Sequence, residues 1–197
     1  MTKAKTNTTK ETILKTAGSL FSQRGYFGVS MQDIADELSI TKAALYYHFE
    51  SKEALTEELL RGTIDELKQE LKHACEVGML PSDKVFNMVK TFLDFKIHHP
   101  ELSLLVSLGF TSDEKEPLVQ FVQDLRIELT KFIRELIGGI DFLRRITYKG
   151  LFLLTTSLLG LVLSPFQNTN NKDIAQDFTD LLFSGTGKKG KNYIIRR

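Results

Sequence analysis

The chain has 197 residues, enough for one domain or two small ones, and 42% of them are hydrophobic, enough to build a buried core. A formal net charge of +1 excludes a strong overall field that attracts nucleic acid, so any such binding must come from local charge. The single cysteine, Cys75, excludes an intramolecular disulfide, and no apolar run follows the first residues as in a signal peptide. We therefore expect a cytoplasmic protein in which Cys75 is a small buried hydrophobe.

Charge is distributed unevenly along the chain. Residues 1–52 carry seven Lys and Arg against five Asp and Glu, and residues 63–184 carry thirteen against seventeen. The last segment, 185–197, carries five basic residues and no acidic one. The ends are therefore basic and the middle is acidic, and the basic segment 185–197 is predicted to be a flexible tail.

The first predicted helix follows a polar arm. Thr8 and Glu11 have the spacing of a capping box, an apolar stripe follows them, and Gly25 has the position of a C-terminal cap. The basic arm, residues 1–7, is predicted to be disordered. A solvated terminus and a contact with DNA phosphates or the minor groove are equally open for it.

Residues 30–49 predict two short helices joined by a tight turn. Ser30 and Asp33 form a second capping box, and Thr41 can cap the second helix while Ile40 fills the gap between the two. In the second helix Leu45, Phe49 and His48 face one way. The opposite face is small, aromatic and cationic, which suits a helix that enters the major groove of DNA. Its residues are Lys42, Ala43, Tyr46 and Tyr47.

This segment resembles the helix-turn-helix of the TetR (tetracycline-repressor-like) family of transcriptional regulators. The resemblance covers about the first 60 residues and rests on several spaced features. They are Leu20-Phe21, Gly25-Tyr26, Ile34-Ala35, the run from Lys42 to Phe49, and Ser51 to Leu55. Two departures are present: Ala43 and Ala44 replace a frequent Gly and Thr or Ser, which removes a hydroxyl contact, and Tyr47-His48 reverses the more frequent His-Tyr order.

The two helices and the resemblance together give the predicted DNA contacts. Lys52, at the start of the next helix, is expected to bind a phosphate. The full set is Ser30, Gln32, Thr41, Lys42, Ala43, Tyr46, Tyr47, His48 and Lys52.

Beyond the helix-turn-helix, apolar periodicity predicts further helices and no strand. They span residues 52–77, 82–98, 101–109, 117–137, 142–164 and 174–182. The predicted fold class is all-α with about nine helices. A three-helix DNA-binding domain (1–52) precedes a helical effector-binding and dimerisation domain (53–184) and the tail (185–197).

Residues 142–163 are the most apolar segment. Thr155 to Ser157 interrupt the run and Arg144, Arg145 and Lys149 precede it, so a buried helix at a subunit interface is favoured over a membrane span. With the stripe at 174–182 it predicts a homodimer built from the last two helices. The expected interface residues are Leu151, Leu154, Leu158, Leu161, Ile174, Phe178, Leu181 and Leu182.

The resemblance also implies an effector pocket between the central helices. Their many Phe residues and few inward charges favour an apolar effector over a sugar or nucleotide, although the same rings could simply fill a core. The expected lining is Phe92, Phe95, His98, Phe110, Phe121, Arg126, Tyr148 and Phe152.

Enzyme signatures are missing from the sequence: it contains no phosphate-binding Gly-rich loop, no Gly-x-Ser-x-Gly and no His-Glu-x-x-His. His98 and His99 could bind a metal, but adjacent histidines on a helix point apart, so a helix end is the better interpretation. We expect no catalytic residue, metal or cofactor. A homodimeric repressor that an apolar effector releases from a palindromic DNA operator is the leading hypothesis, and a helical ligand-binding or scaffold protein without an operator is the alternative.

Overall fold

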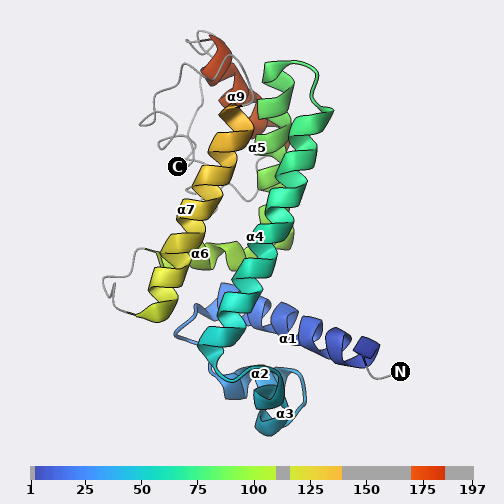
Figure 1. Ribbon diagram of the computed structural model, residues 1–197, viewed down its shortest axis with the longest axis vertical. Coiled ribbons are helices and arrows are strands. Elements are labelled where there is room, and N and C mark those ends of the chain that lie inside the picture. The colour runs from blue at the N-terminus through green and yellow to red at the C-terminus, as the bar shows by residue number, and fades with distance from the viewer. Residues whose placement is uncertain (1–2, 110–115, 139–169, 185–197) are drawn as a thin grey trace, which may run out of the picture.

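The computed structural model describes residues 3–109, 116–138 and 170–184 (Figure 1). Within these ranges it contains eight α-helices, one short 3-10 helix and no strand, which confirms the all-α prediction. The elements are α1 (Lys3–Arg24), α2 (Met31–Glu37), α3 (Lys42–His48), α4 (Lys52–Val77), α5 (Pro81–His98), η1 (Pro100–Leu102), α6 (Ser103–Ser107), α7 (Pro117–Gly138) and α9 (Asn171–Ser184). The helix predicted at 142–164 lies outside the described residues.

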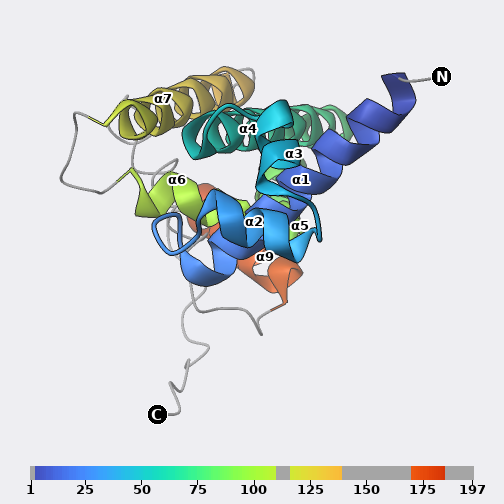
Figure 2. The ribbon, with the colours of Figure 1, turned by 90° about the horizontal axis from the view of Figure 1, so that it is seen from below.

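The long helix α4 connects the two ends of the molecule. Figures 1 and 2 place α1, α2 and α3 together at its N-terminal end, while α5 and α7 run alongside it. Helix α9 packs against α5, and α1 contacts both α4 and η1. The segment at 100–107 therefore contacts α1 directly and forms a second connection, beside α4, to the end that carries α1, α2 and α3.

Helix α1 begins at Lys3, five residues before the predicted start at Thr8. The prediction of a disordered arm was wrong for these residues, because Lys and Ala are strong helix formers and extend the helix without a cap at Thr8. The other end is as predicted: Gly25 has a φ of 72°, and its N–H donates to the Phe21 carbonyl at 2.9 Å.

The single helix predicted for 101–109 is divided into η1 and α6. His99 leaves the helical region, with φ −124° and ψ 66°, because the ring of Pro100 disfavours a helical conformation in the residue before it. The Leu102 N–H then donates to the His99 carbonyl at 3.1 Å, which closes the tighter 3-10 turn.

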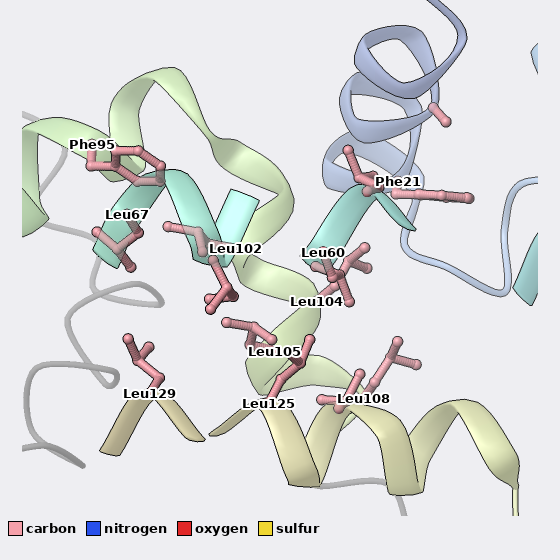
Figure 3. Packing of buried hydrophobic residues seen from close by; sticks show 14 of the residues in the cluster. Phe21, Leu60, Leu67, Phe95, Leu102, Leu104, Leu105, Leu108, Leu125 and Leu129 are labelled. Carbon is pink, nitrogen blue, oxygen red and sulfur yellow. The ribbon is translucent and has the colours of Figure 1, made fainter. Parts of the chain in front are cut away.

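One hydrophobic cluster runs through the whole described structure, from Ile13 to Ala175. Figure 3 shows Phe21 of α1, Leu60 of α4 and Leu104 of α6 gathered at the same part of this cluster. The cluster therefore crosses residue 52 without a break, and the predicted division into domains at that residue stays a prediction.

Ion pairs hold α7, and a side-chain hydrogen bond holds α9, against the central helices. Glu128 of α7 accepts hydrogen bonds from Lys68 and, at 2.8 Å, from Arg61, and these two contacts with α4 lower the pKa of the carboxyl. Asp94 of α5 accepts from the Asn171 amide at 2.8 Å, which holds the first turn of α9.

Candidate nucleic-acid interface

Helix α2 starts with the predicted capping box. The Asp33 N–H donates to Ser30 Oγ at 3.2 Å, and the Ser30 N–H donates to Asp33 Oδ2 at 2.7 Å. The Ser30 hydroxyl also hydrogen-bonds this carboxylate, and this contact is the main reason that the pKa of Asp33 is lowered. The ionised box satisfies two free backbone donors and fixes where α2 begins.

The turn between α2 and α3 is closed by a Schellman motif. The Ile40 N–H donates to the Ala35 carbonyl and the Ser39 N–H to the Asp36 carbonyl, both at 3.0 Å. Ser39 has a φ of 54° at the left-handed position of this motif. The chain can then begin α3 at once, where Thr41 Oγ1 accepts from the Ala44 N–H at 3.1 Å, as predicted.

Helix α3 has one buried and one exposed face. Leu45 and Phe49 are buried, whereas Tyr47 is 82% exposed and Tyr46 is 44% exposed. Lys42, Ala43 and Ala44 are exposed beside them, and the helix contains no acidic residue. Figures 1 and 2 show that this helix lies at the end of the molecule, so its exposed face is open for a partner.

His48 lies between the two faces of α3. It is half-buried, and its ring meets the Tyr47 ring edge-on with centroids 5.4 Å apart. The Lys42 ammonium lies 5.8 Å from the Tyr46 ring. His48 can therefore orient Tyr47, while Lys42 and Tyr46 share the other edge of the exposed face.

The predicted contacts on α2 and at the caps are exposed but already hold local hydrogen bonds. The Gln32 amide donates to Asp36 Oδ1 at 2.7 Å, and Ser30 and Thr41 serve as N-caps. Their contact with DNA stays a prediction, because a capping hydroxyl has limited freedom to reach a second partner.

Lys52 makes contacts within its own chain, while its predicted contact with a DNA phosphate stays a prediction. Its ammonium donates to the carbonyls of Tyr26 (3.1 Å) and Val29 (3.0 Å) and lies 4.0 Å from the centre of the Tyr26 ring. Burial lowers the pKa of Lys52. We therefore expect Lys52 to affect DNA binding mainly by fixing the connector between α1 and α2, instead of offering a free ammonium to a phosphate.

The connector at residues 26–29 contains a residue that the sequence analysis missed. Tyr26 is buried and donates to Glu53 at 2.9 Å, as expected of a packed ring, but Phe27 is 73% exposed. Only one of the two rings in this connector therefore packs inward. With Lys42, Tyr46 and Lys52 it lines a groove of about 520 Å³ beside α3.

Gly28 makes this connector possible. A Cβ atom at Gly28 would lie 2.3 Å from the Arg24 carbonyl oxygen, so only glycine permits the tight approach. The two glycines at 25 and 28, on either side of Tyr26 and Phe27, were the available signal that this connector is too tight to bury both rings.

Comparison with known proteins decides the family. The model of bacterial regulatory proteins of the tetR family matches residues 13–59. The biofilm operon negative transcriptional regulator IcaR of Staphylococcus aureus is 31% identical over 125 residues, which cover 63% of this chain and 67% of IcaR. The chain belongs to the TetR family. YerO of Bacillus subtilis, an HTH-type transcriptional regulator, is 30% identical over 131 residues, covering 65% of this chain and 45% of YerO.

Solved structures show the same fold. AibR in complex with isovaleryl coenzyme A and operator DNA has a TM-score of 0.68 and 22% identity, covering 88% of this chain and 97% of AibR. KstR2 of Mycobacterium tuberculosis, a ketosteroid transcriptional regulator, has a TM-score of 0.67 and 20% identity, covering 91% of this chain and 95% of KstR2. This TetR-family protein is thus a DNA-binding transcriptional regulator and not an enzyme.

The residues predicted for the TetR-family dimer interface are only partly described. Ile174, Phe178 and Leu182 of α9 are partly buried against the hydrophobic cluster of their own chain, whereas Leu181 is 63% exposed. The predicted residues outside the described ranges are Leu151, Leu154, Leu158 and Leu161. Of the described interface residues, Leu181 is the one with most of its surface left for a partner.

The predicted effector residues are not all brought together. Phe92 and Phe95 are buried, His98 is exposed, and Phe121 is half-buried with the Arg61 guanidinium 5.2 Å from its ring. Arg126 donates to the Gly109 carbonyl at 3.1 Å, which connects α7 to the end of α6. The predicted residues outside the described ranges are Phe110, Tyr148 and Phe152.

The described part of the chain lacks two other classes of site. It contains no group of three or more His, Cys, Asp or Glu side chains placed to hold a metal ion. None of its helices combines the length and apolar character needed to cross a membrane.

Proposed function

We propose that this TetR-family regulator is a homodimeric repressor that reads a palindromic operator with α3. The observation that carries the proposal is the exposed face of α3, where Lys42, Tyr46 and Tyr47 stand without any acidic neighbour on the helix. Aromatic rings and an ammonium on a short, capped helix fit the edges and phosphates of a major groove. The similarity to IcaR, a negative regulator, supports repression.

The competing hypothesis, a helical scaffold, gives no reason to expose this face. Selection of bound sequences from random DNA by the full chain separates the two. We expect enrichment of two inverted half-sites whose centres are about 10 base pairs, or a multiple of that, apart. A pool that shows no enrichment after repeated rounds would contradict operator binding.

The effector is proposed to be a small molecule with an apolar body, bound in the helical region after α4. Large buried apolar side chains from α5 and α7 support this, since a highly charged ligand would need buried partners there. The fold neighbour AibR was solved with isovaleryl coenzyme A and operator DNA, so the fold can hold a ligand whose acyl part is apolar, even when the rest of that ligand carries phosphates. Release of the selected operator by apolar acids or esters would identify the effector class.

Dimerisation is proposed to use α9 together with the apolar segment 142–163. We expect Leu181→Asp to shift a dimer of 22.4 kDa chains toward monomers at micromolar concentration, because it places a charge on a large exposed apolar side chain. Light scattering coupled to size exclusion measures this.

Phe27→Asp is the matched control for the dimer experiment. Phe27 is also a large exposed apolar residue, but it belongs to the connector between α1 and α2, and Figure 1 shows these two helices at the opposite end of the molecule from α9. A dimer is expected to persist in this variant. A parent protein that is monomeric, or a Leu181→Asp variant as dimeric as the parent, would contradict the proposed interface.

A further inference from the structure

A second pocket lies where α1, α4 and the end of α5 meet, which we call the hinge pocket. Its volume is about 690 Å³. Leu14, Leu59 and Ile97 give it apolar walls, and Glu101 of η1 contributes a carboxylate. None of the predicted effector residues except His98 lines it, so it is distinct from the effector region proposed above.

Glu101 is held in place by one of its two carboxylate oxygens. The side chain is only 10% exposed, and Oε1 accepts from Thr63 Oγ1 at 2.9 Å and pairs with His99 Nδ1 at 3.1 Å. The His99 ring is itself fixed, because it stacks on Phe95 with centroids 3.9 Å apart and an interplanar angle of 10°. The position of the carboxylate is therefore set before any ligand binds.

The other oxygen, Oε2, has no hydrogen-bond donor among the described residues. It lies toward α1, where a Cβ atom added to Gly18 would come within 3.4 Å of it. No Lys or Arg of the described chain forms a salt bridge with Glu101. A carboxylate buried to this degree gains most from a cationic hydrogen-bond donor at the oxygen that lacks one.

The charges around the hinge pocket also favour a cationic ligand. Besides Glu101, its lining includes Glu11 and Glu58 but only one Lys, Lys15. Glu58 is paired with Lys10 at 2.7 Å. Glu11, Lys15 and Glu58 are all exposed, so the buried charge of the pocket is the Glu101 carboxylate, which stands among apolar walls.

We propose that the hinge pocket binds a small organic cation with an apolar body. Its ammonium group donates to Glu101 Oε2, and its hydrophobic part packs against Leu14, Leu59 and Ile97. Such a ligand touches α1 and α4, the two helices that carry the helix-turn-helix, and also the end of α5 that leads to the effector region. It is therefore placed to act on the connection between the two functions.

Three probes of one shape test the charge requirement: 4-phenylbutylamine, 4-phenylbutanol and 4-phenylbutyrate, each titrated into the full chain by calorimetry. We expect the amine to bind at least tenfold more tightly than the alcohol, and the acid not to bind. Glu101→Gln keeps the shape and a hydrogen-bond acceptor but removes the charge, and it should weaken the amine at least tenfold. Equal binding of the amine and the acid would overturn the proposal.

Gly62 offers a test that leaves the Glu101 contacts intact. It lines the hinge pocket, and a Cβ atom there meets nothing within 4 Å, so a leucine side chain can leave the α4 backbone at this position and occupy pocket space. Leucine is also a better helix former than glycine, which protects the fold. We expect Gly62→Leu to abolish amine binding, while Gly62→Ala, with the same gain in helix propensity and little added volume, keeps it.

The two variants Gly62→Leu and Gly62→Ala also test whether the amine binds in the hinge pocket. If Gly62→Leu binds the amine as well as Gly62→Ala does, the probe binds elsewhere and the hinge pocket is not its site. Operator binding by the unliganded Gly62→Ala variant is expected to match that of the parent. Loss of amine binding and loss of operator binding are therefore measured separately.

Discussion

Replacing Lys42 and Tyr47 together by alanine is expected to weaken operator binding at least about 30-fold for each half-site, because each side chain that contacts a base or phosphate contributes ~1–3 kcal/mol. Both residues are exposed on α3 and make no contact with the core, so the free energy of unfolding should change by less than about 0.5 kcal/mol. Fluorescence anisotropy with labelled operator, at several salt concentrations, measures the loss.

The single variants separate two kinds of contact. If the Lys42 ammonium binds a phosphate, Lys42→Ala should reduce the slope of log affinity against log salt by about one per subunit, whereas Tyr47→Ala should leave that slope unchanged. Lys72→Ala is the control, since Lys72 is an exposed lysine on α4, well beyond the helix-turn-helix. Parent-like affinity in the double variant would show that α3 does not read the operator.

Leu60→Ala is expected to destabilise the whole protein by about 3 kcal/mol, within the range of ~2–5 kcal/mol for removing a fully buried leucine side chain. Leu60 is completely buried and lies in the cluster between Phe21 of α1 and Leu104 of α6 (Figure 3). Because this part of the cluster joins the DNA-binding end to the helices beyond it, both ends should unfold in one transition. Urea titration followed by circular dichroism and by tyrosine fluorescence tests this.

Leu80→Ala makes the same chemical change at a residue that is 60% exposed, and it should cost less than about 0.5 kcal/mol. Two separate transitions in Leu60→Ala, with only one of them shifted, would show that the helix-turn-helix folds independently of the rest. That result would support the domain boundary predicted after residue 52.

The local hydrogen-bond patterns of the helix-turn-helix were predictable because they depend on neighbours in the sequence. Ser30 with Asp33, Thr41 before α3 and Ser51 before α4 each cap the backbone three residues on, and the structure contains all three caps. The orientation of Leu45 toward the core follows in the same way from helical periodicity.

Contacts between distant residues were not predictable in this way. The contact of Lys52 with the carbonyls of Tyr26 and Val29 spans more than 20 residues, and no periodic pattern encodes it. The same holds for Thr63 and Glu101, which are 38 residues apart. A glutamate in a Pro-Glu-Leu turn looks like ordinary surface charge until the fold places it beside α1.

Because α4 is long, a small tilt of this helix is enough to move α3 by a large distance. Its 26 residues form one continuous helix of about 39 Å at ~1.5 Å per residue, and α3 lies close to the N-terminal end of this helix. If α4 tilts by about five degrees about its C-terminal end, its N-terminal end moves by roughly 3.4 Å, which equals the rise of about one base pair along DNA. In the proposed two-fold dimer the two displacements add, so the proposed effector would need to tilt each α4 only this slightly to move the two α3 helices out of register with the operator.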